Sequence, residues 1–275
     1  MTEFFSIWSL EQVQKHISLI PEPEVGEAVL VMLMVRTKLA KSLVGVKVKD
    51  TVLEYGIVIK KDINDNWRER LLKVIKRFAV LKSLANELYT IEKEYGVFPC
   101  PPETCAICVV MNPAKCVDAI VDFIKETVDL VVKQRNVAYA SKVQKRFFGC
   151  LHRRTRHILH CFDIDTKQEG TLEYFLEVVR AFGLEKAVHM VLETRGGYHV
   201  LIDTRIIREE KELNRAYGEF LGLVKERTID KMLQNYCGIV PEPGKRIVEF
   251  NPDAQEPVAG TLYGNFPVKI LYSKF

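Results

Sequence analysis

The spacing of apolar residues divides the chain into a helical first part and a mixed second part. Apolar positions recur every three or four residues from Leu10 to Ile20 and from Trp67 to Tyr95, which predicts amphipathic helices. Between them, Glu24 to Leu43 carries apolar residues throughout and is interpreted as part of the same helical layer, whereas Val46 to Lys61 alternates like a short hairpin. The pattern therefore predicts a mainly helical N-terminal subdomain over residues 1–97.

After the proline-rich breaker Pro99–Pro102, strand and helix patterns alternate. Short apolar runs indicate strands, and spacing of three and four residues indicates helices. The predicted strands are Cys105–Met111, Ile158–Ile164, Val188–Glu193, Tyr198–Asp203 and a segment from Ile247, and the predicted helices are Val117–Val132, Leu172–Phe182 and Lys211–Leu233. This alternation predicts an α+β or α/β sheet domain over residues 98–275.

The composition is that of a globular protein. Apolar residues make up 48 % of the 275 positions and charged residues 28 %, which excludes disordered, collagen-like and coiled-coil classes. No apolar run reaches the roughly 18 residues of a membrane-spanning helix, and the first residues lack a signal or transit pattern. Seven cysteines without a secretory signal favour reduced thiols. We therefore expect an intracellular protein, nuclear, cytoplasmic or organellar, that does not insert into membranes.

Positive charge is concentrated in one segment. Residues Lys133 to Cys161 contain eight lysines and arginines and no aspartate or glutamate, although the net charge of the chain is only +4. A solvated helix face is one interpretation. The segment ends two residues before Asp163, however, and cations leading into carboxylates suit a polyanionic substrate held beside a metal. We expect contacts to nucleic acid from Arg146, Arg153, Arg154 and Arg156.

Asp163 and Asp165 form a candidate metal site within a predicted strand. Side chains two positions apart on a strand point to the same face, so the two carboxylates project together. They repel each other unless a cation lies between them or one is protonated. Mg²⁺ or Mn²⁺ suits the pair because these ions prefer oxygen ligands and leave positions open for phosphates. With a third carboxylate, such a pair can hold two ions roughly 4 Å apart.

The segment Glu193 to Ile202 offers a second set of polar groups. Gly196 and Gly197 allow the backbone to approach a ligand and to present N–H groups to an anion. The hydroxyl, guanidinium and imidazole donors of Thr194, Arg195 and His199 suit a triphosphate. The alternative interpretation is a tight hairpin with the two glycines at its turn.

Two further regions carry candidate ligands. The turn-rich segment Asn251–Ile270 contributes the carboxylate of Asp253 and, after a loop of small residues, Lys269. Cys105 and Cys108 have the spacing of a zinc knuckle. On the predicted strand, however, these two cysteines point to opposite faces, so we expect buried cysteines rather than a structural zinc ion.

Three segments together resemble the archaeo-eukaryotic primase superfamily. Phe162-Asp-Ile-Asp165 is similar to its first motif, and Thr194-Arg-Gly-Gly-Tyr-His199 is similar to its second, with threonine in place of the commoner serine. Gly260-Thr-Leu-Tyr-Gly-Asn265 resembles the loop of the third motif, with Ala259 in place of proline and Asn265 in place of glycine. Upstream, Ala106–Lys115 resembles a strand that ends in Asn-Pro-Arg, here with Ala114 and Lys115. The resemblance covers roughly residues 100–270.

The resemblance implies an RRM-like primase-polymerase sheet domain, preceded here by the helical subdomain. It implies that Asp163, Asp165 and Asp253 hold two Mg²⁺ or Mn²⁺ ions, with Asp230 and Asp203 as alternatives for the third ligand. It also implies that Thr194, Arg195 and His199 bind a triphosphate, assisted by Lys167 and Lys269.

The reaction implied by this resemblance is template-dependent nucleotidyl transfer. A 3′-hydroxyl attacks the α-phosphate of an NTP or dNTP on a single-stranded template, and pyrophosphate leaves. A helicase or a large primase subunit would be the expected kind of protein partner. Two alternatives use the same residues differently: a non-catalytic nucleic-acid-binding subunit of a replication or RNA-processing complex, and a two-metal nuclease.

Overall fold

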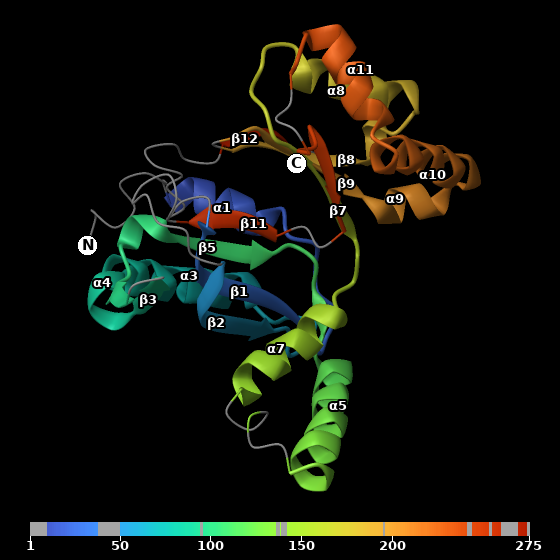
Figure 1. The fold of residues 1–275 in the computed structure, drawn as a ribbon. Coiled ribbons are helices and arrows are strands. Elements are labelled where there is room, and N and C mark those ends of the chain that lie inside the picture. Colours follow the sequence, from blue (N-terminus) through green and yellow to red (C-terminus); the bar gives the residue numbers. More distant parts are fainter. Residues whose placement is uncertain are drawn as a thin grey trace. The chain divides into compact units, whose positions relative to one another are not determined.

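A computed structural model describes most of the chain and divides it into two compact units (Figure 1). Unit 1 comprises Met1–Arg156 and Gln255–Gly260, and unit 2 comprises His157–Ala254 and Thr261–Phe275. The residues that the structure describes are 10–37, 50–93, 96–135, 138, 142–194, 196–240, 244–252, 255–259 and 269–273. Each unit combines helices with antiparallel strands, so the predicted α+β class is confirmed. No helix in these ranges is long and apolar enough to cross a membrane.

Unit 1 is built around one antiparallel sheet. Its strands are β1 (Glu27–Val35), β2 (Thr51–Ile59), β5 (Cys105–Val110), β6 (Ala114–Lys115) and β11 (Gln255–Ala259). They lie in the order β11-β5-β1-β2, and β6 pairs with β1. Because β5 pairs directly with β1, residues on both sides of position 97 share this sheet. The domain boundary predicted at residue 97 therefore lies inside unit 1, and the chain divides after Arg156 instead.

The first hundred residues contain more strand than the sequence predicted. β1 replaces the helix expected over Glu24–Leu43, and all nine of its residues are buried. A strand that is covered on both faces has no apolar and polar alternation, so its pattern resembles that of a buried helix. The hairpin expected over Val46–Lys61 contributes a single described strand, β2, whose partner is β1.

The remaining elements of unit 1 are helices and one small hairpin. They are α1 (Leu10–Ser18), α3 (Trp67–Ser83), α4 (Ala85–Leu88), β3 (Thr90–Lys93), β4 (Gly96–Pro99), η2 (Pro102–Thr104), α5 (Cys116–Thr127), η3 (Val128–Lys133) and α7 (Val143–Arg153). α3 matches the start of the long helix predicted from Trp67, and it buries Trp67, Leu71, Ile75 and Phe78 against the sheet side. The prediction ran on to Tyr95, whereas α3 ends at Ser83 and the chain turns into β3 and β4.

Unit 2 has a second antiparallel sheet with a regular topology. The chain runs β7 (Leu159–Ile164), α8 (Thr171–Ala181), η4 (Glu185–Ala187), β8 (Val188–Glu193), β9 (Tyr198–Asp203), α9 (Thr204–Glu209), α10 (Lys211–Lys225), α11 (Thr228–Cys237) and β10 (Val248–Asn251). In space the strands lie in the order β10-β7-β9-β8, with β12 (Lys269–Ser273) beside β8. The first four strands thus follow a β-α-β-β-α-β path in which the fourth, first, third and second strands are neighbours.

The sequence predicted the elements of unit 2 closely. β8 and β9 have the predicted bounds, β7 starts one residue later than predicted, and α8 both starts and ends one residue earlier. The single helix expected over Lys211–Leu233 is divided into α10 and α11, because Arg227 takes a left-handed backbone conformation with a φ of 59°.

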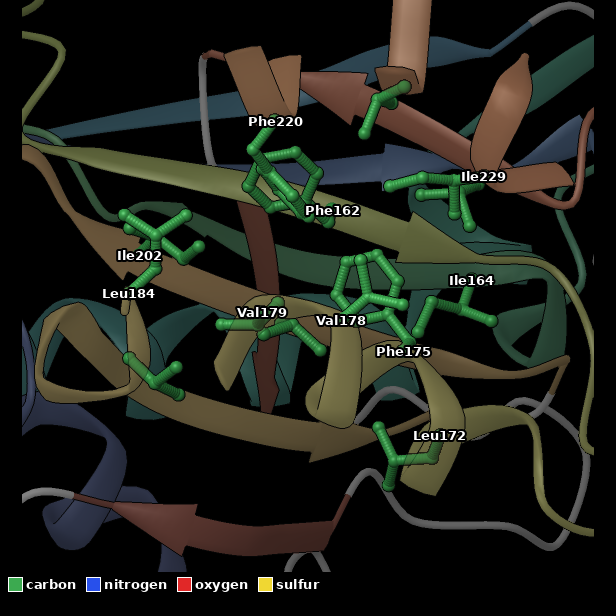
Figure 2. Packing of buried hydrophobic residues seen from close by; sticks show 14 of the residues in the cluster. Phe162, Ile164, Leu172, Phe175, Val178, Val179, Leu184, Ile202, Phe220 and Ile229 are labelled. Atoms are coloured by element: carbon green, nitrogen blue, oxygen red, sulfur yellow. The ribbon is translucent and has the colours of Figure 1, made fainter. Parts of the chain in front are cut away.

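The core of unit 2 lies between the sheet and its helices (Figure 2). Phe162 of β7 contacts Phe220 of α10 and Phe175 of α8, with ring centroids 5.2 and 5.9 Å apart. Ile164 follows two positions later on the same face and is also fully buried. Since side chains alternate along a strand, Asp163 belongs to the opposite face of β7.

His160 lies on the core face of β7, near its start. Its Nδ1 is 2.5 Å from the hydroxyl of Tyr217 on α10, and its ring packs edge-on against Phe250. Burial, together with the nearby His157 and Arg208, lowers the pKa of His160 to about 4. The imidazole is therefore neutral across the physiological range.

Acidification should weaken unit 2 through His160. The folded side chain has a pKa of about 4 and an unperturbed histidine one of 6.5, so between these values the unfolded chain binds the additional proton. The free energy of unfolding should fall as the pH decreases from 6.5 to about 4, and His160→Gln should remove part of that dependence. Urea unfolding at a series of pH values measures this. His152→Gln on α7 is the control, and an unchanged pH dependence in His160→Gln would contradict the prediction.

Candidate active site

Asp163 stands at the centre of a row of polar side chains across three strands. The register of β7 pairs Asp163 with His199 of β9 on one side and with Glu249 of β10 on the other. Residues directly opposite each other in antiparallel strands lie on the same face of the sheet. His199 Nε2 is 3.3 Å from Asp163 Oδ1, and the Asp163 side chain remains 31 % exposed. We call Glu249, Asp163 and His199 the acidic row.

Asp165 lies two residues after Asp163 and adds a second carboxylate from the same segment. It follows the last residue of β7, and its backbone N–H donates to the carbonyl of Ile247 at 2.9 Å, so the chain still runs beside β10. Alternation along the extended chain assigns Asp165 to the face of Asp163, and it is exposed. The two carboxylates predicted to act together therefore share one face and one end of β7.

Gly197 makes the closest backbone contact of the site. A Cβ atom at this position would lie 1.6 Å from the carbonyl oxygen of Ile164 and 2.8 Å from the amide nitrogen of Thr166. No side chain fits there, so only glycine allows the turn between β8 and β9 to reach the segment that carries Asp165. Gly196, by contrast, has open space around it.

Thr194 closes the turn between β8 and β9. Its N–H donates to the carbonyl of Gly197 at 2.9 Å, and its buried hydroxyl oxygen accepts from the N–H of Gly197 at 3.2 Å. This is the tight hairpin that the two glycines allowed as an alternative interpretation. The hydroxyl oxygen predicted to face a triphosphate is used within the turn. Arg195, assigned to the same role, lies outside the described residues.

Lys167 lies at the same end of the sheet and is part of an ion pair. Its Nζ is 2.7 Å from Glu193 Oε1, the carboxylate at the end of β8. The backbone of Lys269 on β12 pairs with the same residue, Glu193, but its side chain lies outside the described residues. Glu193 thus offsets the charge of the one predicted phosphate-binding lysine whose side chain is described.

The third predicted carboxylate, Asp253, and the loop Gly260–Asn265 both lie outside the described residues. The two alternatives to Asp253 have other partners. Asp203 caps α9 by accepting from the N–H of Arg205 at 2.9 Å and forms an ion pair with its guanidinium. Asp230 is buried on α11 and accepts from the N–H of Val248 at 3.0 Å.

Asp203 lies far from Asp165 along the sheet, whereas Asp230 is a buried residue that bonds the backbone of Val248, the strand partner of Ile164. Asp203 pairs with Leu159, four residues from Asp163 and therefore about 13 Å away along β7. Burial alone would raise the pKa of Asp203, but hydrogen bonds from Arg205 outweigh this effect and hold the pKa below its usual value. The hydrogen bonds of both carboxylates indicate structural roles: Asp203 stabilises the start of α9, and Asp230 stabilises the start of β10.

Glu249 is the site residue that sequence reasoning missed. It is exposed and lies opposite Asp163, whereas Val248 beside it is buried on the core face. The local signal was the alternation of Val248-Glu249-Phe250-Asn251 in a predicted strand, which assigns Glu249 to the face away from the core. The alternation does not predict that Glu249 lies next to Asp163, because this position depends on the pairing of β10 with β7.

Most of the basic residues assigned to nucleic acid form ion pairs within unit 1. Arg153 pairs with Glu126 of α5, and Arg154 Nε contacts Asp122 of α5 at 2.6 Å. Arg156 contacts the carboxylates of Glu24 and Glu27 at 2.7 and 2.8 Å, respectively. Arg146 is exposed on α7. The segment itself contains no acidic residues, but acidic side chains from other segments of unit 1 contact its arginines and neutralise much of its positive charge.

The donors at the end of β7 fit a hard divalent ion better than a soft one. Asp163 and Asp165 offer carboxylate oxygens, and their exposure leaves room for water and phosphate ligands, as Mg²⁺ and Mn²⁺ require. Among the described residues, no three histidine, cysteine, aspartate or glutamate side chains are close enough to hold a metal by themselves.

Comparisons with protein-family models, with curated proteins and with solved structures find no match to the chain.

Replacing Gly197 by alanine should disrupt this end of unit 2. The added Cβ would overlap the Ile164 carbonyl, so the turn has to move away from β7, at an expected cost of about 3 kcal/mol or more in the free energy of unfolding. Chemical denaturation monitored by circular dichroism measures this loss. Gly196→Ala adds the same methyl group in open space and should be nearly neutral. Similar losses in both variants would contradict the proposed contact.

Proposed function

We propose that the chain is a metal-dependent nucleotidyltransferase of the primase-polymerase kind, acting on a single-stranded template with NTPs or dNTPs. The observation that carries the proposal is the contact of 3.3 Å between Asp163 and His199. These residues belong to two motifs that resemble those of one superfamily and are separated by more than thirty positions in sequence. Neighbouring strands bring them together on the side of the sheet away from the core.

The topology of unit 2 supports the more specific, RRM-like part of the proposal. An RRM has a four-stranded sheet with helices on one face, and its two central strands carry the residues that contact nucleic acid. In unit 2 the corresponding central strands are β7 and β9. Asp163 lies on the first and His199 on the second, opposite the face covered by the helices.

The side chains at the site have separate roles in the proposed reaction. Asp163 and Asp165 would hold Mg²⁺ or Mn²⁺, which when bound activates the attacking 3′-hydroxyl and stabilises charge on the α-phosphate. His199 would donate a hydrogen bond to a phosphate oxygen from beside Asp163. Lys167 would exchange its contact with Glu193 for one with the outgoing pyrophosphate, at the same end of the sheet.

Incorporation of labelled nucleotides tests the proposal. The purified chain with Mn²⁺ or Mg²⁺, a primed or unprimed single-stranded template and labelled NTPs or dNTPs should give extended products and release pyrophosphate. Asp163→Asn and Asp165→Asn should each lower the rate on the order of a hundredfold or more, because the charge that holds the ion is lost. Asp118→Asn, an exposed aspartate on α5, should leave the rate unchanged.

Three outcomes would reject the assignment. The first is an absence of product from the wild type with either ion and either class of nucleotide. The second is equal product from Asp163→Asn, with circular dichroism showing that both proteins are folded. The third is shortening of the labelled strand without added nucleotide, which would identify a nuclease.

The third carboxylate can be assigned with two further variants. The motif resemblance favours Asp253, whereas Glu249 lies beside Asp163 in the strand register but would have to move to complete a group of three with Asp163 and Asp165. If Glu249 completes the site, Glu249→Gln should lower the incorporation rate and raise the concentration of Mn²⁺ needed for half-maximal activity, and Asp253→Asn should have neither effect. The reverse result would assign the role to Asp253 instead.

A further inference from the structure

Two cysteines of unit 1 bring their sulfur atoms into contact. Cys100 follows β4 and Cys105 begins β5, and the short helix η2 lies between them. Their Sγ atoms are 3.5 Å apart, and both side chains are fully buried. Neither residue belongs to the candidate active site in unit 2.

The backbone on both sides of η2 fixes this contact. The N–H of Cys100 donates to the carbonyl of Tyr89 at 2.9 Å, and the N–H of Thr104 donates to the carbonyl of Pro101 at 3.0 Å. The hydroxyl of Thr104 donates to the same Pro101 carbonyl at 2.7 Å. Cys105 then enters the central sheet opposite Val35 of β1. The two thiols are therefore held together by the fold.

The surroundings differentiate the two thiols. The hydrogen bond with Cys105 lowers the pKa of Cys100 to about 7, and the same bond, with burial, raises the pKa of Cys105. The buried amine of Lys82 on α3 interacts with Cys105, and burial lowers the pKa of Lys82 to about 8. The thiolate is the reactive form of cysteine. Cys100 is thus the expected nucleophile and Cys105 the thiol that resolves its oxidised form.

Local opening of the β3–β4 hairpin would give a small oxidant access to these sulfurs. β4 is exposed at all four of its residues and, within the described chain, pairs only with β3. Two-stranded hairpins of this length are marginally stable by themselves, so this one, although it also contacts α4, is expected to open locally without unfolding unit 1. Opening would expose Cys100, which directly follows β4.

We propose that Cys100 and Cys105 form an oxidisable dithiol that closes to a disulfide when a hydroperoxide is the oxidant, with Lys82 as the cation beside the resolving thiol of Cys105. The Cys100 thiolate attacks the peroxide oxygen, the O–O bond breaks, and a sulfenic acid forms as alcohol or water leaves. The Cys105 thiol then attacks the sulfenic sulfur, and water leaves as the S–S bond forms. Two thiols and one hydroperoxide thus give one disulfide, one alcohol or water, and one water. The sulfurs need to approach by only about 1.5 Å.

Peroxide treatment followed by thiol mapping tests this proposal. The full chain is treated with a small excess of hydrogen peroxide, its remaining thiols are alkylated, and its peptides are weighed. The peptide containing Cys100 and Cys105 should lose two hydrogen atoms, resist alkylation and recover both thiols after reduction by dithiothreitol. In Cys105→Ser, the sulfenic acid of Cys100 should persist and react with dimedone, whereas Cys100→Ser should give neither product.

The role of Lys82 is tested by the pH dependence of the rate at which the disulfide closes. Lys82→Met should slow the attack of Cys105 on the sulfenic acid several-fold and move the midpoint of that rate against pH upward. Lys73→Met is the control, since Lys73 is exposed on the same helix and pairs with Glu69. An unchanged pH profile in Lys82→Met would remove Lys82 from the proposal.

Two results would overturn the dithiol itself. One is full alkylation of both cysteines after peroxide treatment of the folded wild-type chain. The other is oxidation of Cys100 to a sulfinic acid without disulfide formation. Both are measured on the wild type, so they hold even if a cysteine variant fails to fold. Neither readout involves nucleotide incorporation, so failure of this proposal can be distinguished from failure of the proposed function.

Discussion

The register between β7 and β9 is the constraint on which the candidate site depends. Phe162 is paired with Val200 and faces the helices, and Asp163 is therefore paired with His199 on the other side. A shift of one residue would turn Asp163 into the core and Phe162 out of it. The buried contacts of Phe162 with Phe175 and Phe220 oppose such a shift, because exposing one large aromatic side chain costs about 3 kcal/mol. The apolar core on one face of the sheet thus fixes the strand register that places the acidic row on the other face.

Local patterns predicted most elements of unit 2 because these elements alternate in a simple order. The apolar stripe of α8 and the strands β8 and β9 are bounded by turn residues, so their limits could be predicted from short windows. The joint projection of Asp163 and Asp165 also follows from strand alternation alone. The break at Arg227 was missed because nothing in the apolar spacing distinguishes two packed helices from one long helix.

Unit 1 could not be predicted in the same way because its sheet is assembled from distant segments. β5 lies between β1 and β11, whose residues are separated from each other by more than two hundred positions. The same limit affects the charges: Arg156 is neutralised by Glu24 and Glu27, which no local window includes. Glu249 was overlooked for this reason too, because its position beside Asp163 depends on a strand pairing across more than eighty residues.

The acidic row is electrostatically unfavourable for a structural element of the sheet. Like charges on directly opposed positions of neighbouring strands, such as Glu249 and Asp163, destabilise a sheet. Asp165 adds a third carboxylate at the same end, and His199 can offset only part of this charge. Local conflicts of this kind are expected where a site is built for a ligand, and here a bound cation would relieve the repulsion.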